Sequence, residues 1–474
     1  MLKKDTIAAI ATGLTDSGIG IIRISGPEAV LVGDRLFRLP SGKKALEQLP
    51  SHMLQYGFVV DENTEDKTSW KNHILDEVMA VVMKAPRSFT GEDTVEIHCH
   101  GGLLVLQKVL ECAILNGARL AEPGEFSKRS FLNGKMDLAK AEAVIDLIHS
   151  QNEFAHKSAV NQLKGMLSEQ VKNLRSDILY ELAYIEAALD DPEHISLEGY
   201  NEKLSEKVDD ISNRLKKLIA TADNGKLMKE GISTVIVGKP NAGKSSLLNA
   251  LLGQERAIVT DIAGTTRDVL EETIRLQGIG LNIIDTAGIR TTDDVVEKIG
   301  VEKAKKYAGD ADLILYVVDA SVDLDESDRE IISLIKDKKA IVLLNKTDLT
   351  VKVNEHDLED YLKADGCLQT KVIRTSITEN IGIEVLEETI KEMFFRGQIN
   401  MNHEVVITSL RHKQALMEAL ESMTMVKTSL ENEMPEDFYS IDLMSAYASL
   451  GHIIGEEVDD DLVQEIFSKF CMGK

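Results

Sequence analysis

The spacing of hydrophobic and polar positions divides the chain into regions of different character. Over the first part, short apolar runs with the period of a strand alternate with amphipathic stretches such as Leu103–Leu115. This alternation predicts an α+β domain, to which we assign residues 1–120. The predicted strands are Thr6–Thr12, Gly20–Ser25, Met79–Lys84 and Thr94–His98.

From about Asp137 to Met228 the pattern becomes helical, because apolar residues recur three and four positions apart. A short break is expected around Asp190-Asp191-Pro192. The helical spacing returns near the end of the chain. The predicted helical stretches are Ala139–Ser150, Val160–Leu189, Arg411–Leu430 and Ser440–Lys469.

Between the helical segments, strand-like and helix-like runs alternate, which is typical of an α/β domain. We interpret the helical segments as one discontinuous domain with the α/β domain inserted, since the ends of a domain usually lie close together. The predicted boundaries are 121–228 and 398–474 for the helical domain and 229–397 for the inserted domain.

A phosphate-binding loop opens the inserted domain. Its motif, Gly238-x-x-x-x-Gly243-Lys244-Ser245, follows the apolar run Thr234–Val237 and precedes a helical pattern, as phosphate binding requires. Backbone N–H groups and the helix N-terminus would face the phosphates. Lys244 is expected at the β- and γ-phosphates and the Ser245 hydroxyl at Mg²⁺. The predicted contact residues are Asn241, Ala242, Gly243, Lys244, Ser245 and Ser246.

Guanine recognition is predicted at Asn345-Lys346-Thr347-Asp348, directly after the buried-strand run Ala340–Leu344. The Asp348 carboxylate can accept hydrogen bonds from N1–H and the 2-amino group, a donor pair that guanine has and adenine lacks. A site that leaves buried polar groups unpaired rejects the wrong base strongly.

Two more motifs complete a GTP site. Asp285-Thr286-Ala287-Gly288 would bring a carboxylate near Mg²⁺ and a glycine N–H to the γ-phosphate, and Thr265-Thr266 would supply a hydroxyl to the same metal. Because all four motifs occur in the right order, the sequence predicts a GTP-binding domain. Many GTPases orient the attacking water with glutamine after this glycine, but here Ile289 occupies that position. Hydrolysis therefore needs another group, and the following segment offers Asp293, Asp294 and Glu297. The two aspartates are better explained as acids at the start of a helix.

The chain resembles the MnmE (TrmE) family of tRNA modification GTPases over essentially its whole length. The motifs that carry the resemblance are GKPNAGKSS at 238–246, TDIAGTTRD at 260–268, DTAG followed by EKIG at 297–300, GIGIIRISGPEA at 18–29, FTGEDTVEIHCHGG at 89–102, the block 118–144 and the ending Cys471-Met472-Gly473-Lys474.

For the inserted domain, the resemblance implies a potassium-activated mechanism. A K⁺ ion would stand where other GTPases place an arginine, and its charge would neutralise the β- and γ-phosphate oxygens. Glu297 matches the family's catalytic glutamate. The positions that match K⁺ ligands are Asn241, Thr260, Ile262 and Thr265, with Thr266 and Ser245 at Mg²⁺, and Asp285 and Gly288 near the γ-phosphate.

For the first domain, the resemblance implies a folate module that binds 5-formyl- or 5,10-methylene-tetrahydrofolate. Arg23, Glu96, Lys135 and Lys474 match the family's folate contacts, and Cys471 is implied near the modification chemistry. A carboxylate such as Glu96 can pair bidentately with the guanidine-like edge of a pterin. In His98-Cys99-His100, strand alternation would place both histidines on one face and the cysteine on the other.

The implied function is GTP-dependent tRNA modification by a homodimer that forms a heterotetramer with an FAD protein of the MnmG type. Together they would add a carboxymethylaminomethyl or aminomethyl group at C5 of the wobble uridine, with a folate one-carbon unit as donor. An alternative is a GTPase switch in ribosome assembly. The role of Cys471, the nitrogen donor (glycine or ammonia) and the residues that contact the uridine stay open.

Composition limits how RNA can be bound. The 474 residues carry a formal net charge of −25, whereas a protein that grips tRNA alone is expected to have a basic face. Any RNA contact must therefore come from a local basic patch or from a partner. The resemblance implies the second, with tRNA reached mainly through the complex. Four scattered cysteines favour a reducing compartment. No apolar run approaches the roughly 20 residues needed to span a bilayer, so we expect a cytoplasmic protein without membrane insertion.

Overall fold

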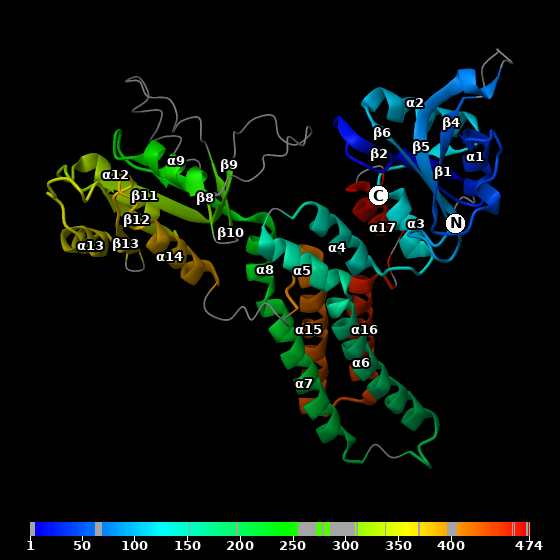
Figure 1. Cartoon of the computed structure of the whole chain (residues 1–474). Helices are drawn as coiled ribbons and strands as arrows, with labels where there is room; N and C mark the ends of the chain where they lie inside the picture. Colours follow the sequence, from blue (N-terminus) through cyan, green and yellow to red (C-terminus); the bar gives the residue numbers. More distant parts are fainter. Residues whose placement is uncertain are drawn as a thin grey trace. The chain divides into compact units, whose positions relative to one another are not determined.

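The computed structural model describes residues 5–61, 69–150, 152–195, 198–254, 272–276, 279–284, 309, 311–336, 338–367, 370–395, 405–456, 458, 460–470 and 473 (Figure 1). The chain divides into two units, and each is described by itself. The first comprises Met1–Ile145, Gln162–Glu186 and Met444–Lys474, and the second Asp146–Asn161 and Ala187–Leu443.

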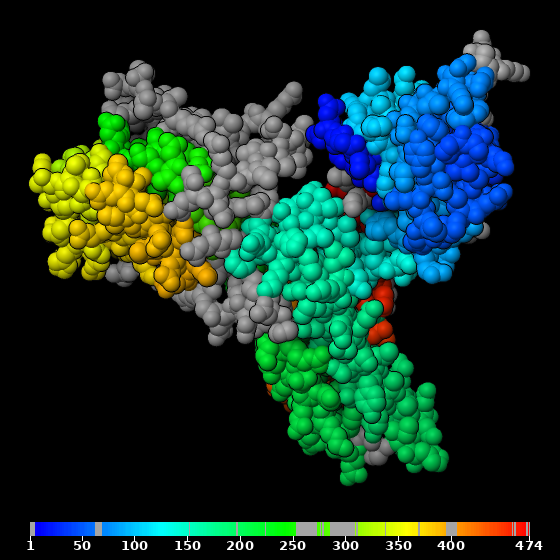
Figure 2. All heavy atoms as spheres, in the orientation of Figure 1, coloured from blue at the N-terminus to red at the C-terminus, as the bar shows by residue number. Residues whose placement is uncertain are grey.

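A seven-stranded sheet forms the centre of the first unit, in the order β3-β4-β5-β6-β2-β1-β7. Neighbouring strands pair antiparallel, except that β1 and β7 are parallel. In the space-filling view, the blue residues of this sheet and its helices form one closely packed body (Figure 2). The strands are β1 Ile7–Ile10, β2 Ser17–Ser25, β3 Phe37–Arg38, β4 Leu54–Val60, β5 Ile74–Met83, β6 Thr94–Gly101 and β7 Arg119–Leu120.

Two helices cover one face of this sheet. Alternate strand residues, among them Ile22, Ile24 and Ile97, are fully buried in the core that also contains residues of both helices. Because side chains alternate along a strand, Arg23 and Glu96 lie on the opposite face. The helices are α1 Ala29–Leu36 and α2 Leu103–Leu115, and short 3-10 turns occur at Leu46–Gln48 and Trp70–His73.

The last helix of the chain packs beside α3 (Figure 1). Phe467 is buried with Leu138, and its ring lies against that of Phe131. This packing brings the end of the chain to the first strand, since a Cβ at Gly473 would lie 2.3 Å from the carbonyl oxygen of Ile10. The other helices that lie largely in this unit are α3 Glu125–Leu132, α4 Leu138–Ile148, α6 Met166–Asp190, α16 Glu436–Ile454 and α17 Asp460–Ser468.

The second unit contains a six-stranded sheet in the order β13-β12-β11-β8-β10-β9. All neighbouring strands are parallel except β9, which pairs antiparallel with β10. The strands are β8 Ile232–Val237, β9 Glu272–Leu276, β10 Ile279–Ile283, β11 Leu313–Asp319, β12 Ala340–Asn345 and β13 Lys371–Arg374.

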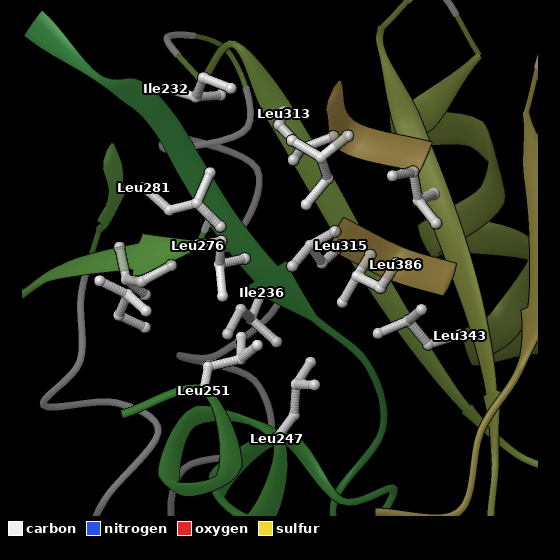
Figure 3. Close-up of a cluster of buried hydrophobic side chains, with 14 of the residues drawn as sticks. Ile232, Ile236, Leu247, Leu251, Leu276, Leu281, Leu313, Leu315, Leu343 and Leu386 are labelled. Carbon is white, nitrogen blue, oxygen red and sulfur yellow. The ribbon is translucent and has the colours of Figure 1, made fainter. Parts of the chain in front are cut away.

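Helices cover both faces of this sheet. Leu247 and Leu251 of α9 and Leu386 of α14 gather over Ile236 and Leu315 of the strands (Figure 3). Residues of α12 and α13 fill the core on the other face. A parallel sheet buried on both sides explains why its strands read as continuous apolar runs. The helices are α9 Lys244–Gln254, α12 Glu326–Ile335, α13 Glu355–Ala364 and α14 Ile383–Phe395.

Long helices form the rest of the second unit. Helices α7 and α15 pack side by side, and α7 buries Leu204, Val208, Ile211 and Leu215, which are three or four positions apart. The helices are α5 Glu153–Leu163, α7 Tyr200–Ala220, α8 Ala222–Glu230 and α15 Leu410–Glu431.

Helix α8 lies where the chain passes between these helices and the six-stranded sheet. The Thr221 hydroxyl accepts a hydrogen bond from the backbone N–H of Ile407, 3.1 Å away. At the other end, the Asn282 side chain of β10 donates to the carbonyl of Glu230 over 2.7 Å. A Cβ at Gly225 would lie 2.0 Å from the carbonyl oxygen of Ile407. The segment around α8 and the segment around Ile407 are therefore in direct contact.

The predicted fold class is confirmed: an α+β first domain, helical segments on both sides of an inserted α/β domain, and a phosphate loop in that domain. Two helix predictions were wrong in detail. Val160–Leu189 is broken at Gly165 and Ser440–Lys469 at Gly455, and both glycines have φ of 86°. This left-handed conformation favours glycine and ends a helix. Within the described residues, no helix has both the length and the apolarity needed to cross a bilayer.

Substitution of Gly225 by alanine tests the contact at α8. We expect Gly225→Ala to destabilise the protein by about 2 kcal/mol, because a backbone carbonyl cannot move away as a flexible side chain can. Gly18→Ala is the control, since a Cβ there would meet nothing within 4 Å. Urea unfolding of both variants checks the prediction. Equal stability of the two would mean that the contact at Ile407 is not tight.

Candidate functional site

The phosphate loop connects β8 to α9 at the middle of the six-stranded sheet. Because β8 lies between β11 and β10, the strand order reverses direction here, which is where open α/β sheets bind ligands. Gly238 and Gly243 have φ of 151° and 108°. A Cβ at Gly243 would lie 2.2 Å from the Asn345 side-chain nitrogen, so a side chain at this position would separate two parts of the site.

The ammonium group of Lys244 is held inside this loop. Its Nζ donates to the carbonyl oxygens of Gly238 and Lys239, at 2.8 and 2.7 Å. Burial lowers the pKa of Lys244. Phosphate oxygens would offer this ammonium stronger, charge-assisted bonds than the two carbonyls do. Of the other predicted loop residues, Asn241 is exposed with φ of 60°, and Ala242 is buried. Ser245 and Ser246 lie in the first turn of α9.

The Asn345 side chain joins the predicted base-binding loop to the phosphate loop. Its amide donates to the carbonyl of Ala242 over 2.9 Å. Its oxygen lies 3.4 Å from both the Thr375 hydroxyl and the Ile377 backbone nitrogen. Asn345 thereby links the ends of three chain segments, and the predicted guanine and phosphate sites lie next to each other.

Two further hydrogen bonds hold the base-binding loop. The Ser376 hydroxyl donates to the Asp348 carboxylate over 2.7 Å. Lys346, at φ of 61°, donates to Asp319 over 2.6 Å. Although burial acts in the other direction, hydrogen bonds from Lys346 and Ser321 lower the pKa of Asp319. The carboxylate that is predicted to bind guanine and the lysine in the same loop are thus both held by neighbours.

The predicted folate residues of the first unit also come together in part. Arg23 donates to Glu96 over 2.8 Å and to the carbonyl of Gly473 over 3.3 Å. Its guanidinium carbon lies 5.6 Å from the centres of both the Phe89 and the Phe126 ring. The arginine therefore joins two strands, two aromatic rings and the end of the chain.

A second arginine of the same unit is buried and forms a charge network. Arg129 is 1% exposed and bonds to Asp5, Glu92 and Glu125. Arg119 also bonds to Asp5 and Glu125. Although burial opposes the shift, hydrogen bonds from Arg119 and Arg129 lower the pKa of Glu125. Such a network is costly to break, because loss of one partner leaves a buried charge without compensation.

Other predicted residues lie at the edge of these clusters or outside the described residues. Lys135 donates to the carbonyl of Pro86 over 2.9 Å rather than to Glu96. The remaining predicted residues fall outside the described part of the chain, and their roles stay predictions: Thr260, Ile262, Thr265, Thr266, Asp285, Gly288, Glu297, Cys471 and Lys474.

The His98-Cys99-His100 motif has the predicted alternation. Cys99 is buried, and burial raises the pKa of its thiol to about 12. His98 lies on the other face, and the exposed His100 pairs with Asp76 at 2.7 Å. Cys99, Cys112 and Cys367 form no disulfide in the described part of the chain. No group of three or more histidine, cysteine, aspartate or glutamate residues is arranged for a metal within the described ranges.

Several residues of both sites were missed from the sequence. Asp319 has one visible signal, since it is a polar residue at the end of a strand in a sheet of this kind. Arg129 has no such signal, because its burial depends on tertiary packing. Lys239, the second residue of the phosphate loop, was missed because the motif leaves its identity open.

Comparison with known proteins identifies the family. A family model of the GTP-binding protein TrmE N-terminus matches residues 6–135, and one of the MnmE helical domain matches residues 138–471. The tRNA modification GTPase MnmE of Lachnoclostridium phytofermentans is 56% identical over 473 residues, with all of both chains covered. The chain belongs to the MnmE family of tRNA modification GTPases.

Other members of the family cover the chain equally well. The proteins of the same name from Acetivibrio thermocellus and Clostridioides difficile are 47% and 48% identical over 474 residues. Each comparison covers 100% of this chain and 100% of the relative. Among solved structures, the G domain of the T. maritima FeoB iron transporter covers 34% of this chain and 97% of its own at 30% identity, with a TM-score of 0.25. The assignment depends on the two family models and the full-length relatives.

Membership settles the broad function. The protein is a GTPase that acts in tRNA modification, and its inserted domain binds GTP. The phosphate loop and the Asn345–Asp348 loop are the parts of the described structure that correspond to this activity.

The charge network around Arg129 predicts how stability depends on pH. The folded pKa of Glu125 is below its ordinary value of 4.5, so its stabilising effect is complete above that pH and is lost as the pH falls through the folded value. We expect Glu125→Gln to cost about 2 kcal/mol at pH 7. The difference from the parent should shrink below pH 4.5.

Urea unfolding at several pH values checks this. Glu465→Gln is the control, because Glu465 forms an exposed pair with Lys469 and should have little effect. A stability difference for Glu125→Gln that does not change between pH 7 and pH 3 would contradict the assignment of a charge effect.

Proposed function

We propose that this protein acts with an FAD-dependent partner of the MnmG type to modify the wobble uridine (U34) of certain tRNAs. The pair would add a carboxymethylaminomethyl or aminomethyl group at C5, with a folate one-carbon unit as donor. The observation that supports this most is the cluster of Arg23, Glu96 and the Gly473 carbonyl in the first unit.

The described residues fit a folate. The partly exposed Phe89 ring offers flat apolar surface for a pterin, and Glu96 offers a carboxylate for its guanidine-like edge. Among the described residues, the buried His98 Nε2 has no hydrogen-bond partner, and it lies 3.7 Å from Glu96 Oε2. A buried polar atom without a partner is costly, and a bound ligand with a polar edge would satisfy it.

Charge suggests how the rest of the folate would be bound. The glutamate tail of folate is anionic and would be attracted to Arg23 or to a lysine such as Lys135 or Lys474. When bound, 5-formyl- or 5,10-methylene-tetrahydrofolate supplies the one-carbon unit. Cys471 would act near it, as a nucleophile or an acid.

For GTP hydrolysis we propose Mg²⁺ at Ser245 and Thr266 and K⁺ at the phosphate loop. Asn241 is exposed at the loop and can offer its side-chain oxygen to a cation. Thr260, Ile262 and Thr265 would supply the other ligands. Asp285 and Gly288 would face the metal and the γ-phosphate, and Glu297 would position the attacking water.

The net charge and the family membership support a proposed assembly. We propose a homodimer that joins an MnmG-type FAD protein as a heterotetramer. A chain with a net charge of −25 is poorly suited to grip an RNA backbone by itself, so tRNA would be bound mainly through the partner.

GTP turnover in potassium and in sodium at equal ionic strength tests the hydrolysis mechanism. We expect strong stimulation by K⁺ in the parent and loss of most hydrolysis in Glu297→Ala, with GTP binding kept. Hydrolysis within about two-fold of the parent would refute the role of Glu297. Equal rates in both salts would refute the role of K⁺.

Mass analysis of wobble uridines tests the modification chemistry. We expect unmodified uridine in cells that lack the protein and in cells complemented with Glu96→Gln, because a neutral amide lacks the negative charge that the pterin edge needs. The control, Glu77→Gln, alters an exposed carboxylate on the neighbouring strand that bonds to Tyr56, and it should restore modification. Normal wobble chemistry without the protein would favour the ribosome-assembly alternative.

A further inference from the structure

Lys239, the second residue of the phosphate loop, forms ion pairs with α12. This helix covers the face of the sheet opposite α9. Lys239 Nζ lies 2.7 Å from Asp328 Oδ2 and 3.0 Å from Asp325 Oδ2, at the start of α12. Most of the loop's chemistry lies in its backbone and in Lys244, so a charged side chain at this position needs its own explanation.

Asp328 is the stronger of the two partners. It is 1% exposed, whereas more than half of the Asp325 side chain is exposed. Its second oxygen accepts a hydrogen bond from the Tyr316 hydroxyl over 2.7 Å. Although burial opposes the shift, hydrogen bonds to Asp328 and Asp325 raise the pKa of Lys239. The position of the Asp328 carboxylate is therefore well defined. Loss of Lys239 would leave a buried charge uncompensated, and loss of the Tyr316 hydroxyl would remove a hydrogen bond from it.

The Asp328 carboxylate lies near the strand that leads into the phosphate loop. Tyr316 is fully buried in β11 and pairs in register with Val237, the residue that precedes the loop. The Asp325 side chain caps α12 by accepting from the backbone N–H groups of Ser327 and Asp328. The first turn of α12 and the strand β11 therefore hold Asp328 from two sides.

Lys239 is thus held through both its side chain and its backbone carbonyl. Its side chain bonds to Asp328, and its carbonyl accepts a bond from the Lys244 ammonium. We propose that the chain of contacts Lys239–Asp328–Tyr316 positions the phosphate loop for GTP. Lys239 and Asp328 are positioning residues, since they act through the carbonyl that holds Lys244.

The expected effect is on affinity. A loop that is already ordered loses less conformational entropy when phosphates bind. Ground state and transition state both need this order, so its loss should raise KM and leave kcat nearly unchanged. This pattern distinguishes positioning from catalysis.

The experiment compares variants in GDP binding and GTP turnover. We expect Lys239→Met and Asp328→Asn each to weaken GDP binding and to raise KM for GTP by about ten-fold, with kcat within about two-fold. Lys239→Arg should stay within about two-fold of the parent, because a guanidinium can keep the pair. The double variant should be no weaker than either single one, since both break the same contact.

Lys352→Met is the matched control, because Lys352 forms an exposed pair with Asp323 in the same domain. Thermal unfolding of every variant separates positioning from stability alone. A lower Tm with unchanged GDP affinity would overturn the proposal, as would additive losses in the double variant.

Asp325→Ser and Tyr316→Phe keep the test decisive if a charge-removing variant fails to fold. Serine at 325 keeps an oxygen that can cap α12, so we expect a less than three-fold change in GDP affinity. Phenylalanine at 316 removes the hydroxyl that orients Asp328, and we expect a three-fold loss or more. The reverse order would overturn the assignment of Asp328 as the anchor.

Discussion

The parallel pairing of β8, β11 and β12 is the constraint on which the nucleotide site depends. Parallel strands present their carboxyl ends at one edge of a sheet, so the segments that follow them must meet there. In this protein those segments are the phosphate loop, Asp319 and the loop that starts at Asn345. The bond from Asn345 to the Ala242 carbonyl then fixes the distance between them. Residues about a hundred positions apart thereby form one binding surface.

The first unit reaches a similar result with antiparallel strands. Pairing of β2 with β6 sets Arg23 opposite Glu96 on the face that α1 and α2 leave open. Helix α17 adds the end of the chain, because Phe467 anchors it beside α3 and Gly473 passes close to Ile10. The cluster around Arg23 thus joins residues that are 450 positions apart in the sequence.

Some of this organisation could be predicted from the sequence, and some could not. Motifs such as the phosphate loop and Asn345–Asp348 are local in sequence, and their flanking apolar runs identify the strands that carry them. The helix breaks at Gly165 and Gly455 were missed because apolar spacing continues across them, while the backbone conformation changes at one residue. The partners Asp328 and Arg129 depend on contacts between distant segments. A single sequence shows their charge but not their burial.

The contact between Gly225 and Ile407 has a mechanical consequence. Thr221 and Gly225, which precede the GTP-binding sheet in the chain, and Ile407, which follows it, are in contact at α8. Because a hydrogen bond and close backbone packing hold these two segments together, a displacement of one must carry the other with it. A change of conformation that reaches the long helices from the GTP-binding sheet is therefore expected to act on both segments at once.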